Sequence, residues 1–79
     1  MESFSLNSAK SYIGKNVNLH LKDGSVIINV HLNSIRKATF GKNNFLYYTP
    51  YKTRKPAQML LHTIAYAELL NLNLMNPTD

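Results

Sequence analysis

Residues 16–32 contain two runs of alternating apolar and polar side chains on either side of the pair Asp23-Gly24. Alternation with a period of two is typical of a β-strand that buries one face. A two-residue Asp-Gly link favours a type I′ hairpin turn, because both central residues must take positive φ. The pattern therefore predicts an antiparallel hairpin over residues 16–32.

This turn also predicts which residues face each other across the hairpin. The inward pairs are all aliphatic and the outward pairs are mostly polar, which favours this register over a slipped one. The inward pairs are Leu21 with Val26, Leu19 with Ile28, and Val17 with Val30. The outward pairs are His20 with Ile27, Asn18 with Asn29, and Asn16 with His31.

Short elements are predicted on both sides of the hairpin. Residues 5–13 are expected to form a helix that Ser5 caps and Gly14 ends, with Phe4 and Ala9 placed as a hydrophobic staple. The second strand should continue through residues 33–35, where the alternation slips by one position and a bulge or bend is expected. A third strand is predicted over 44–49, followed by a polar connection over 50–56.

The C-terminal third is compatible with two structures. Residues 57–70 have good helix formers with Leu60, Ile64 and Ala67 on one stripe. Alternatively, QMLLH is a strand, Thr63-Ile64 a tight turn, and residues 65–74 a final strand; we favour the strands. The predicted fold is mainly β: a five-stranded SH3-like or Sm-like barrel over 16–74 with a short N-terminal helix. The alternative is an α+β fold with a three-stranded sheet and a C-terminal helix.

The length of 79 residues gives room for a single domain, which we place at 1–79. A core this small is marginal, so we expect self-association into a homo-oligomer. The chain has no cysteine and no long apolar run, and its first residues lack the features of a secretory signal. These features predict a cytoplasmic protein without a membrane segment.

The charge is distributed unevenly along the chain. The net charge is +5, yet all nine Lys and Arg residues lie between Lys10 and Lys55, together with a single acid, Asp23. Beyond Pro56 there is no basic residue. Clustered cations favour binding to a polyanion, although a basic surface also serves solubility.

The side chains that could perform acid–base chemistry are few and scattered. Among the four carboxylates only Glu68 lies in an apolar stretch, so a catalytic pair is not expected. His20 and His31 would share a face at about 13 Å, too far apart to hold one metal ion. His62 interrupts an apolar run, where a histidine can be structural or can bind a ligand. We predict neither an enzyme, nor a metal site, nor a cofactor.

A better candidate site combines cations with aromatic rings. Cations follow a phosphate backbone, and exposed tyrosines can stack on unpaired bases. Because neighbouring residues of a strand point to opposite faces, one of the adjacent tyrosines 47 and 48 should belong to the core. The loop at 51–55 could also be no more than a solvated tip. The predicted phosphate contacts are Lys22, Arg36, Lys37, Lys42, Lys52, Arg54 and Lys55, and the predicted base contacts are Tyr47, Tyr48, Tyr51 and His62.

The order of these elements resembles the Hfq branch of the Sm-like small barrels. The stretch IGKNVNLHLKDGSVIINVHL is similar to the first two strands of that family, and QMLLHTI to its segment with a Gln-Met, a histidine and an isoleucine. The resemblance implies an N-terminal helix, five bent strands and rings that bind RNA. It also implies that Gln58 and His62 lie near a central RNA-binding pore, and Tyr47 or Tyr48 near a base-stacking strand.

The sequence departs from the family pattern at three places. Asn29 replaces a glycine of the second strand, the acid expected around Ile35-Arg36 is missing, and Leu61 replaces a lysine before the histidine. Fold alone does not determine function. Our first hypothesis is therefore a non-enzymatic nucleic-acid-binding protein, with single-stranded RNA favoured over DNA. The alternative is a protein-interaction module or small inhibitor that docks on an acidic partner protein.

Overall fold

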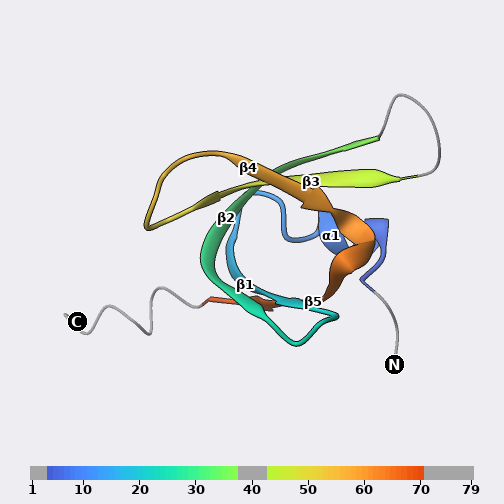
Figure 1. The fold of residues 1–79 in the computed structure, drawn as a ribbon. Helices are drawn as coiled ribbons and strands as arrows, with labels where there is room; N and C mark the ends of the chain where they lie inside the picture. Colours follow the sequence, from blue (N-terminus) through green and yellow to red (C-terminus); the bar gives the residue numbers. More distant parts are fainter. Residues whose placement is uncertain (1–3, 38–42, 71–79) are drawn as a thin grey trace.

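The computed structural model describes residues 4–37 and 43–70, which form a curled antiparallel sheet and one short helix (Figure 1). The strands occur in the sheet in the order β4-β3-β2-β1-β5. The elements are α1 (Leu6–Lys10), β1 (Asn16–Leu21), β2 (Val26–Lys37), β3 (Asn44–Pro50), β4 (Ala57–Leu60), the 3₁₀ helix η1 (Leu61–Thr63) and β5 (Ile64–Leu69).

The predicted hairpin is present, but its turn has three residues instead of two. The Gly24 N–H donates to the Leu21 carbonyl at 3.0 Å, and the Leu21 N–H donates to the Ser25 carbonyl at 2.9 Å. Gly24 has φ +95°, so only this residue takes the left-handed conformation. A turn followed by one such residue is the common three-residue hairpin. The prediction of a two-residue type I′ turn is therefore wrong, and the pairing next to the turn is shifted by one residue.

A bulge restores the predicted register farther along the hairpin. Near the turn Leu19 pairs with Ile27, whereas the prediction opposed it to Ile28. At the far end Val17 pairs with Val30, as predicted. The extra residue is absorbed at Asn29, which has φ +54°. Asparagine tolerates this left-handed conformation better than most side chains, which explains why the bulge lies there.

The predicted irregularity at residues 33–35 is confirmed in the middle of β2. The pairing of β2 with β3 shifts between Leu32 and Ser34, which leaves Asn33 as the extra residue. Bulges bend a strand and increase its twist. The twelve-residue strand β2 consequently pairs with β1 in its first half and with β3 along its second half, and it curves from one side of the molecule to the other (Figure 1).

Residues 57–69 form two strands joined by a 3₁₀ helix, so the alternative with a helix over this stretch is wrong. Strand β4 pairs with β3, and β5 crosses over to pair with β1. The link between them is η1, which begins two positions before the predicted Thr63-Ile64 turn and contains His62. Ile64 and Ala67 of β5 are both buried, and the register of β5 on β1 shifts between them. The predicted continuation to residue 74 lies partly outside the described residues.

The sheet is open in the part of the chain that the structure describes. Strands β4 and β5 are its two outer strands, and the described backbone contains no ladder between them. The prediction of five strands and a short helix is confirmed, whereas the closure into a barrel is not shown. The three-residue link η1 leads from β4 to β5, which pairs with β1 instead of β4. The outer edges of β4 and β5 therefore stay separate.

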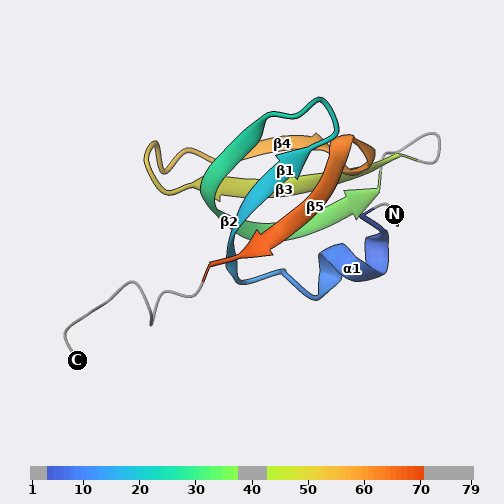
Figure 2. The ribbon, with the colours of Figure 1, turned by 90° about the horizontal axis from the view of Figure 1, so that it is seen from below.

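The helix is shorter than predicted but begins where expected. Ser5 is the N-cap, and its Oγ accepts a hydrogen bond from the Ser8 N–H at 3.1 Å. Regular α-helix ends at Lys10, and residues 11–14 continue as turns up to Gly14, which has φ +86°. The predicted range of 5–13 is therefore too long. Five helical residues are unstable alone, so the contact of α1 with β2 and the burial of Ala9 in the core must hold the helix in place (Figure 2).

The core lies inside the curl and is built from apolar side chains and one tyrosine. Inward-facing residues of the strands supply most of it, while Phe4 and Ala9 extend it to the helix. Both residues of the predicted staple are therefore buried. The buried side chains are Phe4, Ala9, Val17, Leu19, Val30, Leu32, Leu46, Tyr48, Leu61, Ile64 and Ala67.

Candidate nucleic-acid interface

The adjacent tyrosines of β3 point to opposite sides of the sheet. Tyr48 is 9% exposed and belongs to the core, whereas Tyr47 is only partly buried. Cross-strand partners share a face, so Tyr47 lies on the outer surface with Ser34 of β2 and Gln58 of β4. Tyr48 cannot stack on a ligand, and its place among the predicted base contacts is corrected.

Around Tyr47, the outer surface of strands β2, β3 and β4 carries polar, cationic and aromatic groups. The Arg36 guanidinium lies over the Tyr47 ring at 5.4 Å from its centroid. The Asn33 amide donates a hydrogen bond of 2.8 Å to the Thr49 hydroxyl. We call this surface the Tyr47 face; its residues are Asn33, Ser34, Arg36, Phe45, Tyr47, Thr49, Gln58 and Leu60.

The connection after β3 is a tight basic turn joined to the first bulge. The Arg54 N–H donates to the Pro50 carbonyl at 2.8 Å, and Arg54 has φ +58°. The Tyr51 N–H donates to the Asn29 carbonyl at 3.0 Å. These bonds place the Arg54 guanidinium 5.8 Å from the centroid of the Tyr51 ring. Because Tyr51 is 62% exposed, the pair is accessible to a ligand.

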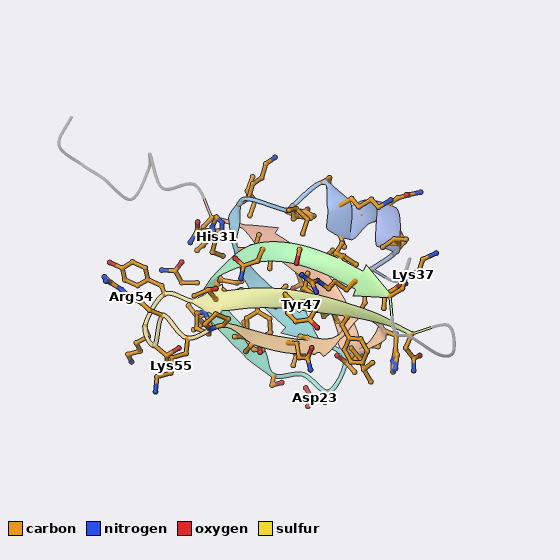
Figure 3. All side chains as sticks on the ribbon, turned by 90° about the horizontal axis from the view of Figure 1, so that it is seen from above. Asp23, His31, Lys37, Tyr47, Arg54 and Lys55 are labelled. Carbon is orange, nitrogen blue, oxygen red and sulfur yellow. The ribbon has the colours of Figure 1, made fainter. Side chains whose placement is uncertain are left out.

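The Tyr47 face and this turn form one continuous strip along β3. Figure 3 shows Tyr47 between Lys37 at one end and Arg54 with Lys55 at the other. Lys37, Lys52 and Lys55 are all exposed. The two acids among the described residues lie elsewhere, Asp23 in the hairpin loop and Glu68 on β5. The strip therefore combines cations with the exposed Tyr51 ring and the partly buried Tyr47 ring, and it carries no described carboxylate.

Two predicted site residues lie outside this strip and next to each other. Lys22 and His62 line an open cavity of about 300 Å³ between the hairpin loop and η1, together with Leu21, Asp23 and Thr63. The Lys22 N–H donates to the Thr63 carbonyl at 2.9 Å and joins the two segments. The predicted residue Lys42 lies outside the described residues.

Sequence reasoning missed two apolar members of the Tyr47 face. Phe45 and Leu60 are cross-strand partners and are only partly buried. The alternation of β3, which places residues 45, 47 and 49 on one side, carried the signal for Phe45. Leu60 could be placed only once the pairing of β4 with β3 was known.

The histidines and Glu68 are arranged differently from the pattern in the sequence. His20 is the partner of Glu68: its Nε2 lies 2.9 Å from Glu68 Oε1. This hydrogen bond, followed by that from Asn18, lowers the pKa of Glu68 from its ordinary value. Two hydrogen bonds from Ser25 likewise lower the pKa of Asp23. Within residues 4–37 and 43–70, no three potential metal ligands gather at one place.

No helix formed by the described residues is long and apolar enough to span a membrane. Comparisons of the chain with protein-family models, with curated proteins and with solved structures return no match. The functional argument therefore depends on the site itself.

Proposed function

We propose that this protein is a non-enzymatic binding module for single-stranded nucleic acid, with RNA preferred over DNA. The observation that carries the proposal is the pair of cation–aromatic contacts on one strip, Arg36 over Tyr47 and Arg54 over Tyr51. Guanidinium and tyrosine planes can both stack on bases, while the guanidinium and the neighbouring lysines neutralise phosphates.

The strip fits a single strand better than a duplex. Exposed ring faces gain stacking energy only from bases that are not already stacked in a helix, at about 1–3 kcal/mol per base. The sheet presents these rings on a curved surface and has no described helix long enough to fill a major groove. The preference for RNA rests on the resemblance to Sm-like barrels.

One departure from the family pattern supports that resemblance after all. Asn29 stands where the family has a glycine, and here it has φ +54°. Glycine adopts this conformation most easily, and asparagine is among the few residues that tolerate it. The replacement thus preserves a backbone that bends β2, which an Sm-like barrel also requires.

We also propose that copies of the chain assemble edge to edge. The sheet ends in β4 on one side and β5 on the other, and neither outer edge is paired by a described strand. Such edges attract further strands unless they are protected. Pairing of β4 in one copy with β5 of the next would extend the sheet around a ring. Size-exclusion chromatography with light scattering, with and without a short oligouridylate, tests this: a hexamer or heptamer supports it, and a monomer at all concentrations contradicts it.

Fluorescence anisotropy with labelled 12-mers of RNA and DNA tests the binding proposal. Replacing Arg54 and Lys55 together by Ala should weaken RNA binding at least tenfold at 50 mM salt without changing the unfolding midpoint. The matched control is the double replacement of Lys10 and Lys15 by Ala, which removes the same charge from exposed sites outside the strip. Equal losses in both variants, or no binding at low salt, would contradict the proposal.

The alternative is an acidic partner protein that binds the same strip. Nuclease treatment of material recovered with the tagged chain distinguishes this alternative from RNA binding. If the partner is a protein, material recovered with the tagged chain remains bound after nuclease treatment. If the partner is RNA, nuclease releases it.

A further inference from the structure

The outer surface of β1, with its neighbours on β2 and β5, differs chemically from the Tyr47 face. His20 pairs with Val26 on one side and with Tyr66 on the other, and Asn18 pairs with Glu68. Ile28, at the bulge opposite Asn18, is 72% exposed. We call this surface the Glu68 face; its residues are Asn18, His20, Val26, Ile28, Tyr66 and Glu68.

The polar centre of the Glu68 face is held in place by three contacts. The His20 and Tyr66 rings are stacked, with centroids 4.2 Å apart and planes within 9°. His20 Nε2 lies 2.9 Å from Glu68 Oε1, and the Asn18 amide donates to the same oxygen at 3.3 Å. Glu68 Oε2 accepts no hydrogen bond from the described residues. One carboxylate oxygen is thus fixed and the other faces solvent.

Large apolar groups lie on the same face as this carboxylate, on β5 beside it and on β2 across β1. Val26 is 43% exposed and Tyr66 is 48% exposed, in addition to Ile28. Exposed apolar side chains that gather around one polar centre mark an interaction surface more often than scattered ones. Residues 16–21, 26–31 and 64–69 contain no Lys or Arg. A surface whose only acidic or basic charge is Glu68 offers a polyanion nothing to bind and repels its phosphates.

We propose that the Glu68 face binds a segment of a partner protein in which a lysine or arginine is flanked by apolar side chains. The cation would bind Glu68 Oε2 and lie against the Tyr66 ring, and the apolar neighbours would cover Ile28 and Val26. Charge complementarity favours this partner, because a cation pairs with the open oxygen of the carboxylate and neutralises its charge. The inference does not depend on the proposed function, since it concerns a separate part of the outer surface of the sheet, over β1 and β5 instead of β3 and β4.

The test uses the ¹⁵N-labelled full chain and capped heptapeptides observed by NMR. The probe is Gly-Ser-Leu-Arg-Leu-Ser-Gly, and in two matched peptides norleucine or glutamate replaces the arginine. We expect saturable amide shifts at residues 26–28 and 64–69 with the arginine peptide, and at least threefold weaker binding with norleucine. The glutamate peptide should not bind.

Variants of the chain distinguish the contribution of the Glu68 carboxylate from that of the apolar side chains. Glu68→Gln keeps an oxygen that can accept from Asn18 but removes the charge, so it should weaken the arginine peptide about threefold to fivefold. Ile28→Ser should weaken the binding of both the arginine and the norleucine peptide, because both carry the leucines that cover Ile28. The control Leu69→Ser changes an equally apolar residue, 52% exposed, whose cross-strand partner is the buried Val17, and it should have no effect.

Four results would overturn the proposal. The first is no shift at millimolar peptide, and the second is binding that Glu68→Gln leaves unchanged. The third is a shift of the Glu68 face by oligouridylate, which would make it a nucleic-acid surface. The fourth is a shift of residues 26–28, which lie on β2 away from the β5 edge, with protein concentration alone; this would make the occupant of the face a second copy of the chain.

Discussion

The Asn29 backbone N–H donates a hydrogen bond of 2.8 Å to Oδ1 of Asn18 on the neighbouring strand. The Asn29 side chain in turn accepts a hydrogen bond of 3.3 Å from the Asn16 amide, and its carbonyl accepts the Tyr51 N–H. One residue thus joins the bulge of the hairpin to the basic turn. The position of the candidate interface depends on this left-handed residue.

Replacing Asn29 tests the importance of its backbone conformation. Asn29→Ala should lower the free energy of unfolding by about 1–2 kcal/mol, because alanine disfavours positive φ. Asn29→Gly should stay within about 0.5 kcal/mol of the parent, because glycine adopts positive φ without strain and this gain offsets the lost hydrogen bond from Asn16. Urea denaturation measures both. Equal losses for Ala and Gly would assign the stabilisation to the side chain instead.

The two adjacent tyrosines should separate stability from binding. Tyr48→Ala removes a buried ring and should cost about 3–5 kcal/mol, or abolish the cooperative transition. Tyr47→Ala should cost less than about 1 kcal/mol and weaken RNA binding by about 1–3 kcal/mol. Thermal unfolding and anisotropy on the same samples distinguish these outcomes. Unchanged RNA affinity in Tyr47→Ala would remove this ring from the interface.

Lysine replacements should change the salt dependence of binding. Each of Lys52→Ala and Lys55→Ala should reduce the slope of log K against log salt by about 0.7, the value for one phosphate contact on a single strand. Lys10→Ala, on α1, should leave the slope unchanged. Titrations between 50 and about 200 mM salt provide the slopes. A drop in slope for Lys10→Ala would indicate a nonlocal charge effect.

Acid should destabilise the fold through two exposed carboxylates. The folded-state pKa of Glu68 lies below its ordinary value of 4.5, and that of Asp23 below 3.8. Each carboxylate therefore stabilises the fold above its unfolded pKa, and this contribution disappears as the pH falls through the folded pKa. We expect the urea midpoint to decrease as the pH falls below about 5.

Two amide variants assign that pH dependence. Glu68→Gln should remove the loss of stability that begins near the ordinary pKa of Glu68. Asp23→Asn should remove the loss of stability that occurs at lower pH. Urea midpoints at pH values above, between and below the two ordinary pKa values provide the comparison. A parent-like acid profile in Glu68→Gln would show that the bond to His20 contributes nothing to stability.

Local patterns in the sequence predicted most strands because their causes are local. The hairpin, the bulge in residues 33–35 and the strand at 44–49 follow from alternation and turn residues. The length of the hairpin turn was wrong because Asp-Gly suits either a two-residue turn or a three-residue turn with glycine last. Only the compensating bulge at Asn29 reconciles the longer turn with the predicted pairing of Val17 and Val30.

Contacts between distant segments were beyond the sequence pattern. The pairing of His20 with Glu68 joins residues 48 positions apart and depends on the β1–β5 ladder. The cavity that Lys22 and His62 share likewise depends on η1 folding against the hairpin loop. The residues of the basic turn could be grouped from the sequence because they are neighbours in the chain. The hydrogen bond from the Tyr51 N–H to the Asn29 carbonyl could not be predicted, because it depends on the bulge.

The β1–β5 ladder has a consequence for how the chain folds. Every other ladder joins strands that follow one another, whereas β5 must return across the whole sheet to reach β1. Closing so large a loop costs conformational entropy before the β1–β5 hydrogen bonds form. The meander of β1 to β4 should therefore form first, and β5 should dock last. Until then one edge of β1 and the apolar interior stay open to other molecules. The interval before β5 docks is therefore when this small protein is most exposed to aggregation.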